Sequence, residues 1–128
     1  KINLFLNKRK KIYDYYEINL DNFKNIISFP KYNKLNNPTY HLIIINIKFK
    51  NLKEKNNFIK YILKKNIILQ FHYKPIISFN IYHGHREKLE SSNIYYKSSI
   101  SIPIFNNISK KEIDYTIRTI KHYIFNNH

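Results

Sequence analysis

The ten residues from Tyr40 to Phe49 constrain this chain most, because they predict a strand that needs cover on both faces. Alternate residues of a strand point to opposite sides of its sheet. One side is apolar throughout, while the other begins apolar and turns polar at Asn46 and Lys48. The members of the fully apolar side are Ile43, Ile45, Ile47 and Phe49. The strand should start buried on both faces and end half exposed, which requires helices packed against a sheet.

Three segments have the periodicity of amphipathic helices. Residues 2–18 and 54–65 each place apolar side chains three and four positions apart. Asn66 follows the second segment and can take the left-handed conformation that ends a helix. The third helix begins at the Ser-x-x-Glu capping pattern of Ser109 and Glu112 and runs toward the C-terminus.

The remaining elements are shorter. Ile67 to Tyr73 predicts a second strand that ends before Pro75, and Ser99 to Ile102 predicts a short extended segment. Residues 92–97 suggest a short helix. A chain of 128 residues supports one core. The predicted fold class is therefore α/β (α+β), a small sheet of about three strands with helices packed on it.

Composition makes the high positive charge ambiguous. The formal net charge is +15, which by itself suggests a nucleic-acid partner. The chain has no Ala, Val, Met, Cys or Trp and a single glycine, Gly84, and its dominant residues have AT-rich codons. The lysines are spread along the whole chain, so a solvated surface explains most of the charge. Without cysteine there is no disulfide or thiolate zinc site, and the longest apolar run, Leu42 to Ile45, is too short to span a membrane.

Three groups of residues could bind ligands, and each has a simpler explanation. The segment Phe71 to Pro75 places an imidazole, a phenol and an ammonium group at the end of a strand, where they could bind an anion or form a core edge. His83 and His85 resemble a metal pair, but two histidines without a further ligand more often mark an exposed loop. The basic run Lys8 to Lys11 could grip phosphate or form the solvated face of a helix.

An ordered set of motifs resembles the C-terminal part of the DegT/DnrJ/EryC1/StrS aminotransferases. It consists of Gln70 to Ile76, then Tyr95 to Phe105 with its Ser-Ile-Pro stretch, then the cap at residues 109–112 and a closing helix. Upstream, residues 8–16 resemble the helix that leads out of the large domain, and residues 39–42 resemble the start of the first small-domain strand. The resemblance covers nearly all of the chain.

The resemblance implies a fold-type-I enzyme, a cytoplasmic homodimer that uses pyridoxal 5′-phosphate and takes its amino group from glutamate. Residues 1–20 would lead from the large domain, and residues 21–128 would form the small domain. The wording His-Tyr-Lys-Pro resembles the branch that aminates a UDP-linked 4-keto-6-deoxy sugar on the way to pseudaminic acid. The residues implied to line the sugar-nucleotide pocket are Gln70, Phe71, His72, Tyr73 and Lys74.

The chain also departs from the family pattern. Asn66 to Ile68 stands where the family has Gly-Ile-Gly, and the pattern of a Schiff-base lysine, a pyridine-pairing aspartate and a phosphate cup is absent. We therefore expect no catalytic, cofactor-binding or metal-binding residue in this chain, and no transamination by it alone. Two alternatives remain: a small basic nucleic-acid-binding module, and a degenerate interaction domain with no open pocket at His72.

Overall fold

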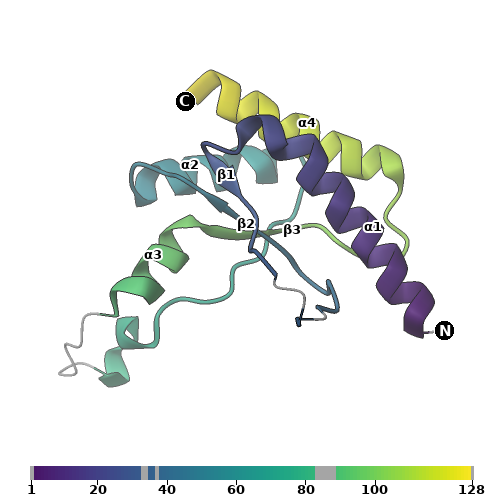
Figure 1. Ribbon diagram of the computed structural model, residues 1–128. Coiled ribbons are helices and arrows are strands. Elements are labelled where there is room, and N and C mark those ends of the chain that lie inside the picture. The colour runs from purple at the N-terminus through teal and green to yellow at the C-terminus, as the bar shows by residue number, and fades with distance from the viewer. Residues whose placement is uncertain (1, 33–34, 37, 83–88, 128) are drawn as a thin grey trace.

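The computed structural model describes residues 2–32, 35–36, 38–82 and 89–127 as a small antiparallel sheet with helices packed on it (Figure 1). The helices and strands are α1 (Ile2–Leu20), β1 (Ile27–Ser28), β2 (Ile43–Ile47), α2 (Leu52–Lys64), α3 (Glu90–Ser98), β3 (Ser99–Ile102) and α4 (Lys110–Asn127). Short 3-10 helices occupy Asp21–Phe23, Ile76–Ser78 and Asn80–Tyr82. The predicted fold class is confirmed.

The sheet has the strand order β1-β2-β3, and both pairings are antiparallel. The paired residues of its apolar face are Ile27 with Ile47, Ile45 with Ile100, and Ile43 with Ile102. Helices α1, α2 and α4 cover this face, while α3 projects away from the layer (Figure 1). The opposite face is more polar, and there the Ser99 hydroxyl donates to Asn46 Oδ1 at 2.8 Å.

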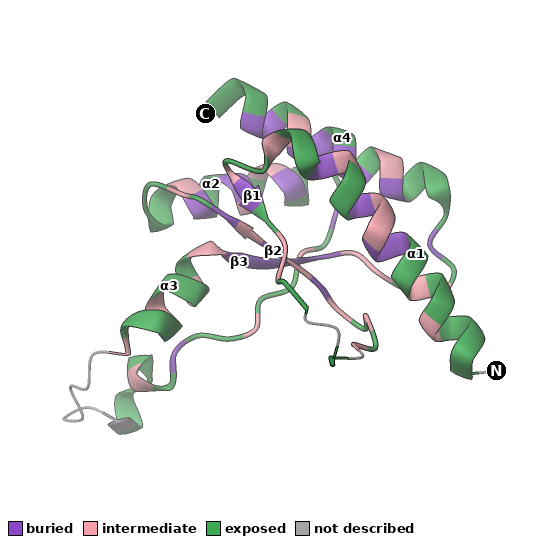
Figure 2. Cartoon of the chain, in the orientation of Figure 1, coloured by how far each residue is buried: buried purple, intermediate pink, exposed green. Residues whose placement is uncertain are grey.

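The core lies between the apolar face of the sheet and the three covering helices (Figure 2). Tyr16, Phe58 and Ile120 represent α1, α2 and α4 there, and each side chain is fully buried. The apolar stripe predicted for residues 2–18 joins the core only from Ile12 onward, because the first turns of α1 have no neighbouring element to cover them. Leu63 of α2, one of the apolar residues of the predicted helix at 54–65, is 59% exposed and lies outside the core.

The strand predicted at Ile67 to Tyr73 is wrong. Only Gln70 pairs with the sheet, through an isolated antiparallel bridge to Ser101. That register places residue 68 opposite Pro103, which has no N–H to donate. It also places residue 72 opposite Ser99, whose N–H donates to Tyr95 O and whose carbonyl accepts from the Lys55 ammonium group. Both neighbouring positions of the ladder are therefore blocked.

The third strand of the sheet is β1, which the sequence pattern did not predict. Its two residues precede Phe29 and Pro30, and Ile27 is 2% exposed. The helix end predicted at Asn66 is confirmed, because this residue has a φ of 58° and its N–H donates to Leu63 O at 2.9 Å. None of the helices within the described residues combines the length and apolarity that a membrane span would need.

Candidate functional site

The segment from Gln70 to Lys74 runs along the outer edge of β3. The bridge at its start fixes its position, because Gln70 N donates to Ser101 O at 3.0 Å and Ser101 N donates to Gln70 O at 2.9 Å. After this bridge the chain has no strand partner, and it continues to the buried Pro75 and a 3-10 helix. The five predicted site residues are therefore anchored at one end and released from the sheet at the other.

His72 is the most unusual side chain of this segment. Both of its ring nitrogens are buried, and neither has a hydrogen-bond partner among the described residues. Its ring packs edge-on against Tyr73, with the centroids 5.0 Å apart. A buried imidazole gains free energy from a hydrogen bond at each nitrogen, so an unpartnered ring marks a place where a ligand or a further protein surface fits.

Phe71 lies beside a buried ammonium group. The Lys55 Nζ is 5.5 Å from the Phe71 ring centroid and 5.0 Å from that of Tyr96. It donates to the Ser99 carbonyl at 3.2 Å and also to the Tyr96 carbonyl. Burial lowers the pKa of this lysine, whose side chain is 4% exposed overall. Lys55 therefore connects α2 to the site segment and to the junction of α3 and β3.

The sequence pattern contained a signal for Lys55 that the site prediction missed. Lys55 precedes the buried residues Phe58 and Ile62 by three and seven positions, so helical periodicity places it on the buried face of α2. Lysine on such a face is rarely buried unless its ammonium group is paired. The identity of its partners, two backbone carbonyls, could not be read from residue types.

Tyr73 and Lys74 are solvent-facing. The Tyr73 side chain is 77% exposed, and the Lys74 Nζ lies 5.4 Å from the ring centroid of Phe79. Both groups can therefore approach a ligand without rearrangement of the core. Of the five predicted residues, His72 is the one whose polar atoms are buried, while the others place part of their side chains in solvent.

The larger of two described pockets adjoins the start of this segment. Its volume is about 540 Å³, and of the predicted site residues it includes Gln70 but not Phe71 to Lys74. The pocket lies between residues 66–70, the end of β3 and the first turns of α4. Because Phe71 to Lys74 do not line it, the five predicted site residues do not form a single pocket in this chain alone.

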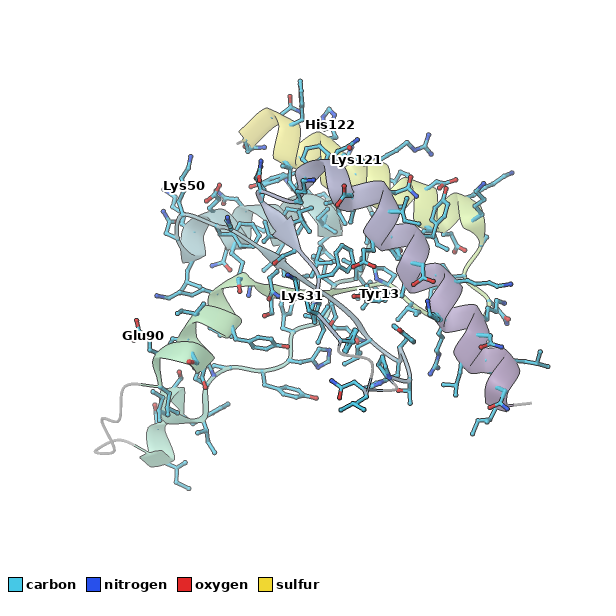
Figure 3. The ribbon with its side chains drawn as sticks, in the orientation of Figure 1. Tyr13, Lys31, Lys50, Glu90, Lys121 and His122 are labelled. Carbon is cyan, nitrogen blue, oxygen red and sulfur yellow. The ribbon has the colours of Figure 1, made fainter. Side chains whose placement is uncertain are left out.

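A second, more open groove of about 460 Å³ lies between α2 and α4. It brings together Lys65, Arg118 and His122 beside tyrosine rings, and the His122 ring is stacked on Tyr61 at 6.4 Å. His122 is labelled near the end of α4 in Figure 3. This groove is the place where basic and aromatic side chains meet on two helices.

The other predicted sites have different outcomes. His83 and His85 lie outside the described residues, and within the described ranges no three His, Cys, Asp or Glu side chains gather as a metal site would require. In the run Lys8 to Lys11, Lys10 pairs with Asp14 one turn along α1 at 2.6 Å, and both side chains are well exposed. The three lysines of the run are exposed, as on a solvated helix face, whereas Arg9 is partly buried and its Nε has no hydrogen-bond partner among the described residues.

A pyridoxal phosphate cofactor would need an accessible lysine amine and a phosphate cup. Lys55, the buried lysine among the described residues, is enclosed by two rings and bonded to two carbonyls, so its nitrogen cannot reach a cofactor aldehyde. The five residues of the site segment include one lysine, Lys74, which lies on an exposed stretch with no glycine-rich loop beside it. The residues described here therefore do not fit the cofactor.

Comparison with solved structures identifies the fold as the one found in a part of aminotransferases. The aminotransferase TlmJ from Streptoalloteichus hindustanus superposes with a TM-score of 0.86 at 13% identity, covering 98% of this chain and 33% of that chain. Helicobacter pylori PseC, an aminotransferase of pseudaminic acid biosynthesis, gives 0.84 at 19% identity, covering 97% and 34%. The PLP form of a Streptococcus pneumoniae protein assigned as a sugar aminotransferase gives 0.81 at 24% identity, covering 94% and 31%.

A match to a family model identifies the family of this chain. The model of the DegT/DnrJ/EryC1/StrS aminotransferase family matches residues 1–121, and the chain belongs to this family. It spans about a third of the length of the solved structures that it resembles. A comparison with curated proteins finds no match.

Proposed function

We propose that this chain is the part of a pyridoxal-phosphate-dependent aminotransferase that borders a sugar nucleotide. The observation that carries the proposal is the family match over residues 1–121. Its proposed contact residues are Gln70, Phe71, His72, Tyr73 and Lys74. The buried, unpartnered nitrogens of His72 support this assignment, because hydroxyl groups of a bound sugar would satisfy them.

The side chains of the segment suit different parts of such a substrate. His72 can donate to or accept from a sugar hydroxyl, since a neutral imidazole has one nitrogen of each kind. Lys74 carries a positive charge on an exposed stem and can approach a diphosphate. In this proposal the chain's own residues bind and orient the substrate, and none of them exchanges a proton with the reacting carbon.

The proposal assigns the cofactor to a part of the protein outside these 128 residues. Residues 1–20 would lead from that large domain, and residues 21–128 would form the small domain beside the substrate. When bound there, pyridoxal phosphate supplies the electron sink for amino transfer. Glutamate as amino donor, a homodimer and a cytoplasmic location complete the proposal.

The proposed substrate is a UDP-linked 4-keto-6-deoxy sugar of the pseudaminic acid type. The choice over other sugar nucleotides rests on the segment, which reads His-Tyr-Lys-Pro from His72 to Pro75. The fold superposes on Helicobacter pylori PseC with a TM-score of 0.84 and on TlmJ with 0.86, so the superposition supports the fold and does not select the sugar.

The test is a chimera in which this chain replaces the equivalent domain of Helicobacter pylori PseC. The half-reaction with glutamate and the half-reaction with the keto sugar can be followed separately by absorbance. We expect His72→Phe to lower kcat/KM for the keto-sugar half-reaction by about 5- to 150-fold, because about 1–3 kcal/mol of hydrogen bonding is lost. The glutamate half-reaction should change less than twofold.

His122→Phe is the matched control, since it makes the same substitution at an exposed residue of α4 that lines neither the segment nor the pocket beside Gln70. It should leave both half-reactions unchanged. A His72→Phe chimera that binds the cofactor and turns over the keto sugar at the unmodified rate would refute the assignment of His72. Equal losses in both half-reactions would indicate damage to the fold instead of the substrate contact.

The two alternatives have less support. Tyr13, Tyr16 and Tyr123 are buried in the core, and Lys31, Lys50 and Lys121 project from separate parts of the chain (Figure 3). A nucleic-acid module would instead expose aromatic rings beside clustered lysines. Of the two described pockets, the groove between α2 and α4 has tyrosine rings beside basic groups, but it contains one lysine, Lys65. A degenerate interaction domain would explain the absence of His72 from the larger pocket, but it offers no reason for the family match.

A further inference from the structure

The pocket of about 540 Å³ is large enough for a small organic molecule. Most of its wall is apolar, from Leu42 on one side to Ile104 and Phe105 on the other. Phe105 is 47% exposed, so a ring that enters the pocket covers apolar surface that now faces solvent. Burial of that surface is the driving force for binding an apolar ring.

Ser101 and Gln70 are among the polar residues that line the same pocket. Ser101 is 4% exposed, and its hydroxyl has no hydrogen-bond partner among the described residues. Its backbone N–H and carbonyl are both used in the bridge to Gln70, so the hydroxyl is the free polar group of this residue. The exposed side chain of Gln70 lines the pocket too. A ligand hydroxyl placed here can both donate and accept.

The charge of the wall selects against anions. Glu112 lines the pocket, and the amide and hydroxyl of Ser109 each donate to its Oε2 at 2.7 Å. These two bonds lower the pKa of Glu112, which keeps its carboxylate ionised near neutral pH. Among the described residues, no lysine or arginine lines the pocket, and the imidazole of His41 is engaged with Thr39 Oγ1 at 2.9 Å.

We propose that this pocket binds a small uncharged molecule with an apolar ring and a hydroxyl group, recognised by the Ser101 hydroxyl. The proposal does not rest on the proposed aminotransferase function. A sugar nucleotide carries a diphosphate, which the Glu112 carboxylate disfavours, so the pocket is a second ligand site beside the segment that contains His72.

Benzyl alcohol and benzoate are matched probes, because they share a ring and differ in charge. Binding to the 128-residue chain is measured by saturation-transfer NMR, which reads the ligand and is independent of the association state of the protein. We expect saturable binding of benzyl alcohol with a millimolar Kd and at least tenfold weaker binding of benzoate. Ser101→Ala should weaken benzyl alcohol at least threefold without harming the fold, because the hydroxyl it removes has no partner.

Glu112→Gln tests the charge of the wall, since glutamine keeps the size and the capping geometry of the side chain. It should strengthen benzoate at least threefold and leave benzyl alcohol unchanged. Ser92→Ala on α3, an exposed serine away from the pocket, is the control and should alter neither Kd. Equal Kd values for the two probes, the absence of saturation, or unchanged binding in Ser101→Ala would each overturn the proposal. None of these results bears on the keto-sugar half-reaction.

Discussion

The ammonium group of Lys55 donates a hydrogen bond to the carbonyl oxygen of Ser99 at 3.2 Å. The same nitrogen donates to the Tyr96 carbonyl, and within the described ranges no carboxylate lies at ion-pair distance from it. These bonds hold the end of α3 against α2. The bond to Ser99 also occupies the carbonyl that a strand partner at residue 72 would need. One lysine therefore lies against the site segment and prevents it from extending the sheet.

Lys55→Met should reduce the free energy of unfolding by about 1–3 kcal/mol, because two buried carbonyls lose a charged donor. The loss outweighs the relief of desolvation, since methionine fills the space of the stem but cannot pair the oxygens. Urea denaturation at pH 7 measures the difference. Lys53→Met, on an exposed position of the same helix, is the control and should change stability by less than about 0.5 kcal/mol.

The buried ammonium group of Lys55 should also make the free energy of unfolding depend on pH, in a direction that follows from its pKa. Burial lowers the pKa of Lys55 in the folded chain, so between that lowered pKa and the ordinary value of 10.5 the unfolded chain binds more protons. The free energy of unfolding of the wild type should therefore rise with pH in this window relative to Lys55→Met. A constant difference between the two proteins from pH 7 to 10.5 would contradict the assignment.

Tyr16 should make the free energy of unfolding fall as pH rises, at higher pH than the effect of Lys55. Burial raises its pKa to about 12, and its hydroxyl donates to the Pro103 carbonyl at 3.2 Å. The stability that it contributes is complete below the unfolded pKa of 10.0 and is lost as pH rises from there toward 12. Tyr16→Phe should be less stable by about 0.5–1.5 kcal/mol at pH 8 and lose less stability by pH 11.5. Parallel curves for the two proteins in urea titrations would exclude Tyr16 as the group responsible.

The sequence predicted the elements whose own residues determine them. The closing helix follows from the Ser109 and Glu112 cap and a regular isoleucine period, and the central strand follows from alternation between Ile43 and Ile47. The helix end at Asn66 follows from a residue that tolerates positive φ. In each case the information is local, so residue types and spacing were sufficient.

Errors arose where a distant residue decides the outcome. Ile67 to Tyr73 has the composition of a strand, but Pro103 and the Lys55 bond to Ser99 remove its ladder partners. β1 is two residues long and depends on β2 for its pairing, so no periodicity could develop. The site segment was found because its motif order resembles a family, whereas the adjoining pocket depends on how separate segments meet.

Asn66 allows a matched pair of substitutions at one backbone position. Its φ of 58° is in the left-handed region, where a Cβ without a compensating polar group costs about 1–2 kcal/mol. Asn66→Ala should lower the free energy of unfolding by about that amount, whereas Asn66→Gly should leave it within about 0.5 kcal/mol. Asn57→Ala, on the exposed face of α2, controls for the general effect of alanine and should be neutral or slightly stabilising. Equal losses for alanine and glycine would show that the side chain of Asn66, not its φ, matters.

Ser109 and Glu112 form a reciprocal cap at the start of α4. The Glu112 N–H donates to the Ser109 hydroxyl at 3.3 Å, while the Ser109 N–H donates to the Glu112 carboxylate at 2.7 Å. Ser109→Ala should cost about 0.5–2 kcal/mol of stability. The bonds from Ser109 lower the pKa of Glu112, so its contribution is present above pH 4.5 and is lost as pH falls through the lowered value.

Urea titrations from pH 3 to 7 test both statements, with Ser92→Ala as a control of equal size on exposed α3. The stability difference between wild type and Ser109→Ala should shrink at the acid end, because protonated Glu112 is a poorer acceptor for the Ser109 donors. A stability difference that stays constant down to pH 3 would show that the ionisation of Glu112 does not contribute to the stabilising effect of Ser109.

The first turns of α1 predict how the isolated chain behaves in solution. Ile2 and Leu4 are each 73% exposed and Phe5 is 46% exposed, so neighbouring apolar side chains project from one end of the helix. A contiguous exposed apolar patch favours association. The 128-residue chain should therefore elute as species heavier than 15.7 kDa in size-exclusion chromatography with light scattering. Leu4→Gln combined with Phe5→Gln should shift the mass toward 15.7 kDa. Ile94→Gln, which removes an isoleucine that is 60% exposed on α3, should not shift it. A wild-type chain that is a monodisperse monomer and unfolds cooperatively would show that the exposed end of α1 needs no partner.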